Sequence, residues 1–139
     1  MPAQRVPRIR SYSLNGGLNP LGDGFLDDQL PGWPYLSARK YSQLVTPPPS
    51  NVYTFVDVEE RCIDSGDFSF WVSSVTAPLS WFHLPADRNN RGANLGYADS
   101  HAAYQRWRWP KVFRQYGQQP ANQLDRADLN FFLEHAARK

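Results

Sequence analysis

The chain has 139 residues, of which 41% are hydrophobic and 14% aromatic, with 12 prolines and 9 glycines. This length predicts a single domain, and its apolar content is sufficient for a buried core, which excludes a wholly disordered chain. The prolines and glycines predict short elements joined by long loops. No apolar run approaches the roughly 18 residues that a membrane span needs, and residues 1–10 lack the apolar stretch of an export signal.

The 15 basic and 13 acidic residues give a formal net charge of +2, and an acidic middle section precedes a basic C-terminal section. Aromatic and basic residues alternate there: Tyr104, Arg106, Trp107, Arg108, Trp109, Lys111, Phe113 and Arg114. Cations beside stacking rings are typical of nucleic-acid-binding surfaces. A strand that turns its aromatic residues to a core and its basic residues to solvent gives the same pattern. We favour this second interpretation and expect no nucleic-acid partner.

The two parts of the chain differ in their local signals. Residues 1–50 are rich in turn-forming residues and predict an irregular, loop-rich part of the domain, whereas residues 51–139 predict a sheet core and a C-terminal helix. Residues 52–56 are β-branched and aromatic throughout, which predicts a central strand. Shorter strands are expected at residues 10–14 and 68–72.

A β-hairpin is predicted from residues 94–98 and 102–109, which flank Asp99-Ser100. The second turn position favours Gly because it requires a positive φ, so Ser100 predicts either mild strain or another turn type.

The best helical signal lies at the C-terminus, where Asp125 is expected as the N-cap. Leu129, Phe132, Leu133 and Ala136 follow helical spacing and predict an apolar stripe that docks on the sheet. The predicted fold class is therefore α+β, a small antiparallel β-sheet with long loops and a C-terminal helix.

The sequence offers little support for catalysis. His83, His101 and His135 lack the spacing of a metal site, and neither a nucleophile-elbow motif nor a phosphate-binding glycine loop is present. Cys62 is the only cysteine and has acidic neighbours, which predicts neither a zinc site nor a reactive thiol. We therefore expect no enzyme and no cofactor, with one candidate exception.

That exception is a group of acidic residues, Asp57, Glu59, Glu60 and Asp64. Several carboxylates converging on one loop could bind calcium. The spacing is not that of an EF-hand, because Arg61 occupies a position where a ligand is required. The favoured alternative is a solvated acidic loop, partly paired with Arg61 and Arg88.

An ordered series of short motifs spans most of the chain, at residues 10–16, 49–57, 63–68, 81–86, 89–101 and 128–133. It includes the segment Gly92-Ala-Asn-Leu-Gly-Tyr-Ala-Asp-Ser-His101. The series resembles the type II secretion pseudopilin-like family, and more narrowly the members with a prepilin-type processing-associated domain. The signature of that domain is a His, nine intervening residues and then Asp-Gly. The signature positions correspond to Asn89, Asp99 and Ser100, followed by His101, so Asn replaces the signature His and Ser replaces the signature Gly.

The resemblance implies a β-rich globular head on the extracytoplasmic face of the cell membrane or in the periplasm. It implies a structural or interaction role in a secretion or pilus-type assembly, through protein partners or self-assembly in a pilus-like fibre. Family members carry a prepilin leader and a long hydrophobic N-terminal helix, which these residues do not include. Membrane contact is therefore expected only through such a missing helix.

Two other functions remain open from the sequence. A carbohydrate- or other ligand-binding module would use exposed aromatic side chains, for which the candidates are Trp33, Trp81, Trp107 and Trp109. An enzyme would need a closed pocket that joins the acidic loop to the hairpin turn, and this is the least favoured of the three.

Overall fold

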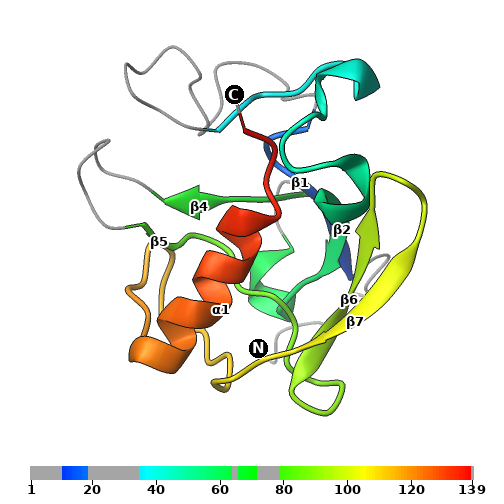
Figure 1. The fold of residues 1–139 in the computed structure, drawn as a ribbon. Coiled ribbons are helices and arrows are strands. Elements are labelled where there is room, and N and C mark those ends of the chain that lie inside the picture. Colours follow the sequence, from blue (N-terminus) through cyan, green and yellow to red (C-terminus); the bar gives the residue numbers. More distant parts are fainter. Residues whose placement is uncertain (1–10, 19–34, 64–65, 72–78, 139) are drawn as a thin grey trace, which may run out of the picture.

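A computed structural model describes residues 11–18, 35–63, 66–71 and 79–138 of the chain (Figure 1). The strands are β1 (Tyr12–Asn15), β2 (Tyr53–Asp57), β3 (Asp67–Phe68), β4 (Phe70–Trp71), β5 (Ser80–Trp81), β6 (Gly92–Tyr97) and β7 (Ala102–Arg106). The helices are α1 (Gln123–Glu134) and three 3₁₀ turns, η1 (Tyr41–Gln43), η2 (Pro49–Asn51) and η3 (Glu60–Cys62). The α+β class predicted from the sequence is confirmed.

The main sheet has five strands in the order β3-β1-β2-β6-β7, and β4 and β5 form a separate two-stranded sheet. The pairs β1–β2, β2–β6 and β6–β7 are antiparallel, whereas β1 and β3 are parallel. The prediction of an antiparallel sheet is therefore wrong at one edge. The segment predicted as one strand at residues 68–72 divides into β3 and β4, which join different sheets.

The main sheet buries one face and leaves the other open, as antiparallel sheets commonly do. Figure 1 shows α1 lying across one side of the sheet, with the β6–β7 hairpin at its edge. Phe132 of α1 lies at the centre of the core, with its ring centroid 5.3 Å from that of Tyr53, 4.9 Å from Phe68 and 5.4 Å from Trp107. The predicted central strand, β2, contributes Tyr53 and Val56 to this core.

The predicted apolar stripe of the helix is confirmed in its main members. Leu129, Phe132 and Ala136 are buried, and Leu133 packs at the margin of the core. Ala136 lies just beyond the end of α1, which closes at Glu134.

The predicted N-cap is wrong. Asn122 caps α1, because its side-chain oxygen accepts hydrogen bonds from the backbone N–H groups of Leu124 and Asp125. Asp125 lies inside the first turn and is buried. Its carboxylate has another role, described below.

The N-terminal part of the chain packs against the segment that follows α1. The backbone N–H of Leu36 donates to Ala137 O at 2.9 Å, and that of Arg138 donates to Thr46 O at 2.7 Å. Tyr53 at the start of β2 donates to His135 O at 3.2 Å. The described residues of the loop-rich part are therefore held by backbone hydrogen bonds to the C-terminal segment.

The β6–β7 hairpin is present as predicted, but its turn is longer. Tyr97 N donates to His101 O at 2.9 Å, and Ser100 N donates to Tyr97 O at 3.0 Å, which leaves residues 98–100 as a three-residue loop. Ser100 has a φ of 78°. This geometry matches the common hairpin loop in which a left-handed residue follows a tight turn.

We predict that Ser100→Gly stabilises the protein by about 1 kcal/mol, because glycine adopts a positive φ without the steric cost that Ser100 bears. Urea unfolding of the two proteins measures the difference. Ala98→Gly in the same loop is the matched control. It is expected to destabilise by roughly 0.5–1 kcal/mol, because Ala98 has no positive φ to relieve. A neutral or destabilising Ser100→Gly would contradict the argument.

Candidate functional site

The turn that leads into β6 is held by a residue of the neighbouring strand. Asn90 and Arg91 have positive φ values of 51° and 57°. The Tyr104 hydroxyl donates to Asn89 O at 2.7 Å and to Asn90 O at 2.8 Å, so β7 fixes this turn. A Cβ at Gly92 would collide with the Tyr104 ring and with the Gln105 carbonyl oxygen, so only glycine fits there.

Asp57, at the end of β2, lies beside this turn and is only 3% exposed. Its carboxylate pairs with the guanidinium of Arg88, which also donates to Val58 O at 3.1 Å. The Asn89 side chain lies 3.5 Å from the second carboxylate oxygen. Burial raises the pKa of Asp57, and the charge of Arg88 opposes that rise.

The other acidic residues of the proposed calcium site are arranged differently. Glu59 caps η3 by accepting from Arg61 N at 2.6 Å, and it pairs with Arg61 Nε at 3.1 Å. Glu60 is exposed, and Asp64 lies outside the described residues. Within the described ranges, no group of three or more His, Cys, Asp or Glu side chains could hold a metal ion.

The predicted pairing of this loop with Arg61 and Arg88 is confirmed. Its predicted solvation is wrong for Asp57, because Arg88 covers that carboxylate against the sheet.

Asp99 and His101 form a polar pair at the hairpin tip. Asp99 Oδ1 lies 2.5 Å from His101 Nδ1 and accepts from His101 N at 3.2 Å. Both bonds lower the pKa of Asp99, and the bond to the His101 side chain has the larger effect. The His101 ring stacks on Tyr97, with the ring centroids 4.3 Å apart.

The structure does not bring the signature positions into one site. Asn89 belongs to the turn before β6, and Asp99, Ser100 and His101 belong to the turn after it. The six residues of β6 separate the two turns by about 20 Å at the usual rise of a strand. The signature segment therefore consists of one strand and the turns at its two ends.

Two of the four candidate binding tryptophans are core residues, which makes that prediction wrong for them. Trp81 is fully buried and donates from its ring N–H to Asp125 Oδ1 at 3.2 Å. Trp107 is 2% exposed and donates to Ala86 O at 2.7 Å. Trp109 is 37% exposed, and Trp33 lies outside the described residues.

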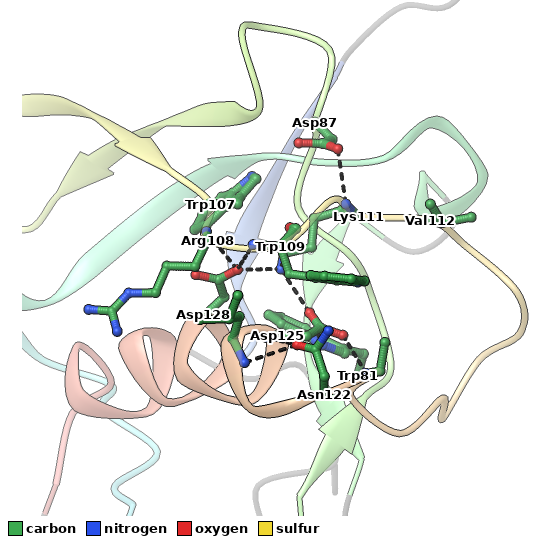
Figure 2. Close-up of polar contacts among 12 residues, drawn as sticks. Trp81, Asp87, Trp107, Arg108, Trp109, Lys111, Val112, Asn122, Asp125 and Asp128 are labelled. Carbon is green, nitrogen blue, oxygen red and sulfur yellow. Dashed lines mark hydrogen bonds and ion pairs between the residues drawn. The ribbon is translucent and has the colours of Figure 1, made fainter.

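The buried polar group around Lys111 has no counterpart among the candidate site residues that the sequence singled out. Lys111 belongs to the stretch of alternating aromatic and basic residues, and the accessible fraction of its side chain is 0%. Figure 2 shows its ammonium group between Asp125 and Asp128 of α1, at 2.8 Å from Asp125 Oδ1 and 2.6 Å from Asp128 Oδ2. A third hydrogen bond, of 3.0 Å, goes to Trp109 O.

The same two carboxylates hold the backbone around the lysine. Asp128 accepts from the N–H groups of Arg108 at 3.0 Å and Trp109 at 3.1 Å. Asp125 accepts from Ala121 N at 2.8 Å. Helix α1 is thus fixed to the segment that follows β7. We refer to Lys111, Asp125 and Asp128 as the buried lysine cluster.

A shallow hollow of about 130 Å³ lies beside this cluster, lined mainly by Leu84, Trp109, Pro110 and Val112. An ammonium group has three hydrogens, and all three of those on Lys111 are used within the protein. The lysine therefore presents no free donor to a molecule in the hollow. The geometry gives the cluster a structural role.

The open face of the main sheet carries several exposed aromatic side chains. The register places Leu14, Phe55, Gly96 and Ala102 in one row across β1, β2, β6 and β7. Tyr12, Phe55 and Tyr104 are on this face and are each nearly half exposed. Exposed rings on a face of small residues are suited to contact with another protein.

Comparisons with known protein families, with curated proteins and with solved structures found no match to this chain. Among the described residues, no helix has the length and apolar character needed to cross a bilayer.

We predict that Lys111→Met destabilises the protein by about 3–5 kcal/mol, because it leaves two buried carboxylates without their cation. Urea unfolding measures this loss. The control is Lys40→Met, at an exposed lysine, which should change stability by less than about 0.5 kcal/mol. The triple variant K111M/D125N/D128N should recover part of the loss, since it removes the buried charges. Equal stability of Lys111→Met and the parent protein would contradict this account.

We also predict that His101→Ala raises the pKa of Asp99 towards its ordinary value, because the His101 side chain is the main cause of the lowering. The lowered pKa favours the folded protein at pH values above the ordinary aspartate pKa. This contribution is lost as the pH falls through the lowered value. NMR titration of the Asp99 carboxyl carbon gives both values. Asp57 in the same spectra is the internal control, and an unmoved Asp99 would refute the assignment.

Proposed function

We propose that this chain is the non-catalytic globular head of a pseudopilin-like protein, with a structural or interaction role in a secretion or pilus-type assembly. The proposal places it on the extracytoplasmic side of the membrane or in the periplasm. Its partners would be other proteins, or further copies in a pilus-like fibre.

The main support is the backbone at the signature segment. The signature has Gly where this chain has Ser100, and Ser100 adopts a φ of 78°, a conformation that favours glycine. This turn connects the antiparallel strands β6 and β7, which pair on its two sides.

A second support is that the polar clusters are used within the protein. Lys111 donates to two carboxylates and a carbonyl, and Asp57 is paired with Arg88. Asp99 and His101 lie at a hairpin tip, with side chains 36% and 45% exposed, and not in an enclosed pocket. These arrangements favour a structural role for each group over catalysis.

The burial of Trp81 and Trp107 removes two of the four aromatic residues on which a ligand-binding module was expected to rely. Trp109 is the one described tryptophan of that set with a substantially exposed ring. The open sheet face, with Tyr12, Phe55 and Tyr104, favours a protein contact instead.

The first test uses the genomic DNA upstream of Met1. The proposal expects an in-frame hydrophobic segment of about 20 residues behind a basic leader, since this length crosses a bilayer. In spheroplasts of the native cell, added protease should then degrade the head. An in-frame stop codon immediately upstream, or a head protected inside intact spheroplasts, would refute the proposal.

The open face supplies a second test in the same cells. Phe55→Asp in the full-length gene product should abolish its chemical cross-links to assembly partners, because it places a charge in the proposed contact. Tyr41→Asp is the matched control, since Tyr41 is 62% exposed and lies outside the sheet. Loss of cross-links in both variants, or in neither, would argue against this face as the contact.

A further inference from the structure

The edge strand β7 has a free row of backbone groups. The β6–β7 pairing has a regular register with no bulge. It is flanked by the bonds from Tyr97 N to His101 O at one end and from Trp107 N to Arg91 O at the other. In an antiparallel pair, alternate residues bond to the neighbouring strand, so Ala102, Tyr104 and Arg106 direct their backbone N–H and C=O groups away from β6. β7 is the last strand of the sheet, and these three residues are exposed.

The residues of β7 itself offer little obstruction along this edge. Ala102 and Ala103 are exposed alanines, and β7 contains neither a proline nor a bulge. One of its groups is already used, because the carbonyl of Arg106 accepts from Gln105 Nε2 at 3.0 Å. An exposed edge strand with outward backbone groups is a template for another strand.

The two ends of the edge carry opposite charges. Asp99 lies at the hairpin tip, where its side chain is 36% exposed. Arg91, Arg106 and Arg108 lie at the other end, where Trp107 pairs with Arg91. All three arginines are exposed, and none forms an ion pair with a described residue.

We propose that β7 pairs antiparallel with β7 of a second copy of this chain, about a two-fold axis at Tyr104. The Tyr104 N–H and C=O groups would then bond in both directions, and Arg106 N–H would bond the Ala102 carbonyl of the second copy. This register pairs Ala102 of each copy with Arg106 of the other, so the hairpin tip that carries Asp99 lies at the end of the partner strand where Arg106 and Arg108 are. The two main sheets become one continuous sheet.

The charges select this arrangement over its alternatives. A parallel pairing would set Asp99 against Asp99 and the arginines against arginines, which like-charge repulsion disfavours. The antiparallel pairing is self-complementary. Each β7 has an acidic end and a basic end, and in this pairing the acidic end of one copy lies beside the basic end of the other. A two-fold contact of this kind closes at two copies. The inference concerns the edge strand alone and goes beyond the proposed assembly role.

The test is sedimentation equilibrium of the 139-residue chain from micromolar to millimolar concentrations at low salt. The proposal expects a reversible dimer that weakens as salt is added. Asp99→Lys and Arg108→Glu should each weaken the dimer by roughly tenfold or more, because each replaces two attractive contacts with repulsive ones. The double variant D99K/R108E should restore it, because the charges are exchanged between the two ends.

Two further variants locate the contact. Ala102→Pro replaces an outward N–H with a ring that projects towards the second copy, and it leaves the β6 bonds untouched. It should therefore abolish the dimer while circular dichroism shows an unchanged fold. Arg39→Glu makes the same charge reversal at an exposed arginine outside the hairpin and should leave the dimer intact. In the dimer, hydrogen exchange at Tyr104 and Arg106 N–H should slow with rising concentration.

A monomer throughout the concentration range would overturn the proposal. So would a dimer that Ala102→Pro leaves unchanged, or a double variant no tighter than the single ones. A failure here leaves the upstream-helix and cross-linking results unaffected, and the reverse also holds. The two proposals therefore stand or fall separately.

Discussion

The buried lysine cluster is the constraint on which the arrangement of this domain depends. A charged ammonium and two carboxylates leave water together, at a desolvation cost that only close pairing and additional hydrogen bonds offset. The cluster meets that requirement, because Asp125 and Asp128 also accept from the backbone at Ala121, Arg108 and Trp109. Such a cluster tolerates few alternative geometries. It sets the position of α1 along the sheet and the path of the chain after β7.

The aromatic core packs directly against the buried lysine cluster. Lys111 lies 5.3 Å from the centre of the Trp81 ring and 5.7 Å from that of Trp107, so the rings shield the cation from water and also attract it. Trp81 bonds Asp125 directly. The polar cluster and the apolar core around Phe132 are therefore one interlocked structure. This explains how a domain with many loops keeps a defined interior.

Sequence patterns predicted the elements whose signals are local. Strand β2, the β6–β7 hairpin and the apolar stripe of α1 each follow from periodicity, and turn chemistry indicates either strain or another turn type at Ser100. The parallel β3 edge depends on a long-range pairing with no local signal. The true N-cap was missed because both Asn122 and Asp125 are good capping residues, and tertiary contacts decide between them.

Lys111 and the tryptophans show a different limit. Alternation of aromatic and basic residues predicts which side chains share a face, but the chain leaves β7 at Arg106 and the alternation ceases to apply. One signal was available. Asp125 and Asp128 continue the apolar stripe of Leu129 and Phe132 towards the N-terminus, and carboxylates on a buried face require a cation nearby. The sequence could not show which cation that is.

The contact between Tyr104 and the turn at Asn89 and Asn90 has a consequence for the order of folding. It joins residues 15 and 14 positions apart, so the hairpin closes at both ends through contacts that are short along the chain. Short-range contacts cost little loop-closure entropy and form early. The buried lysine cluster joins α1 to the segment after β7, so it forms only as the helix docks. We therefore expect the hairpin to form first and to act as the template on which the helix docks.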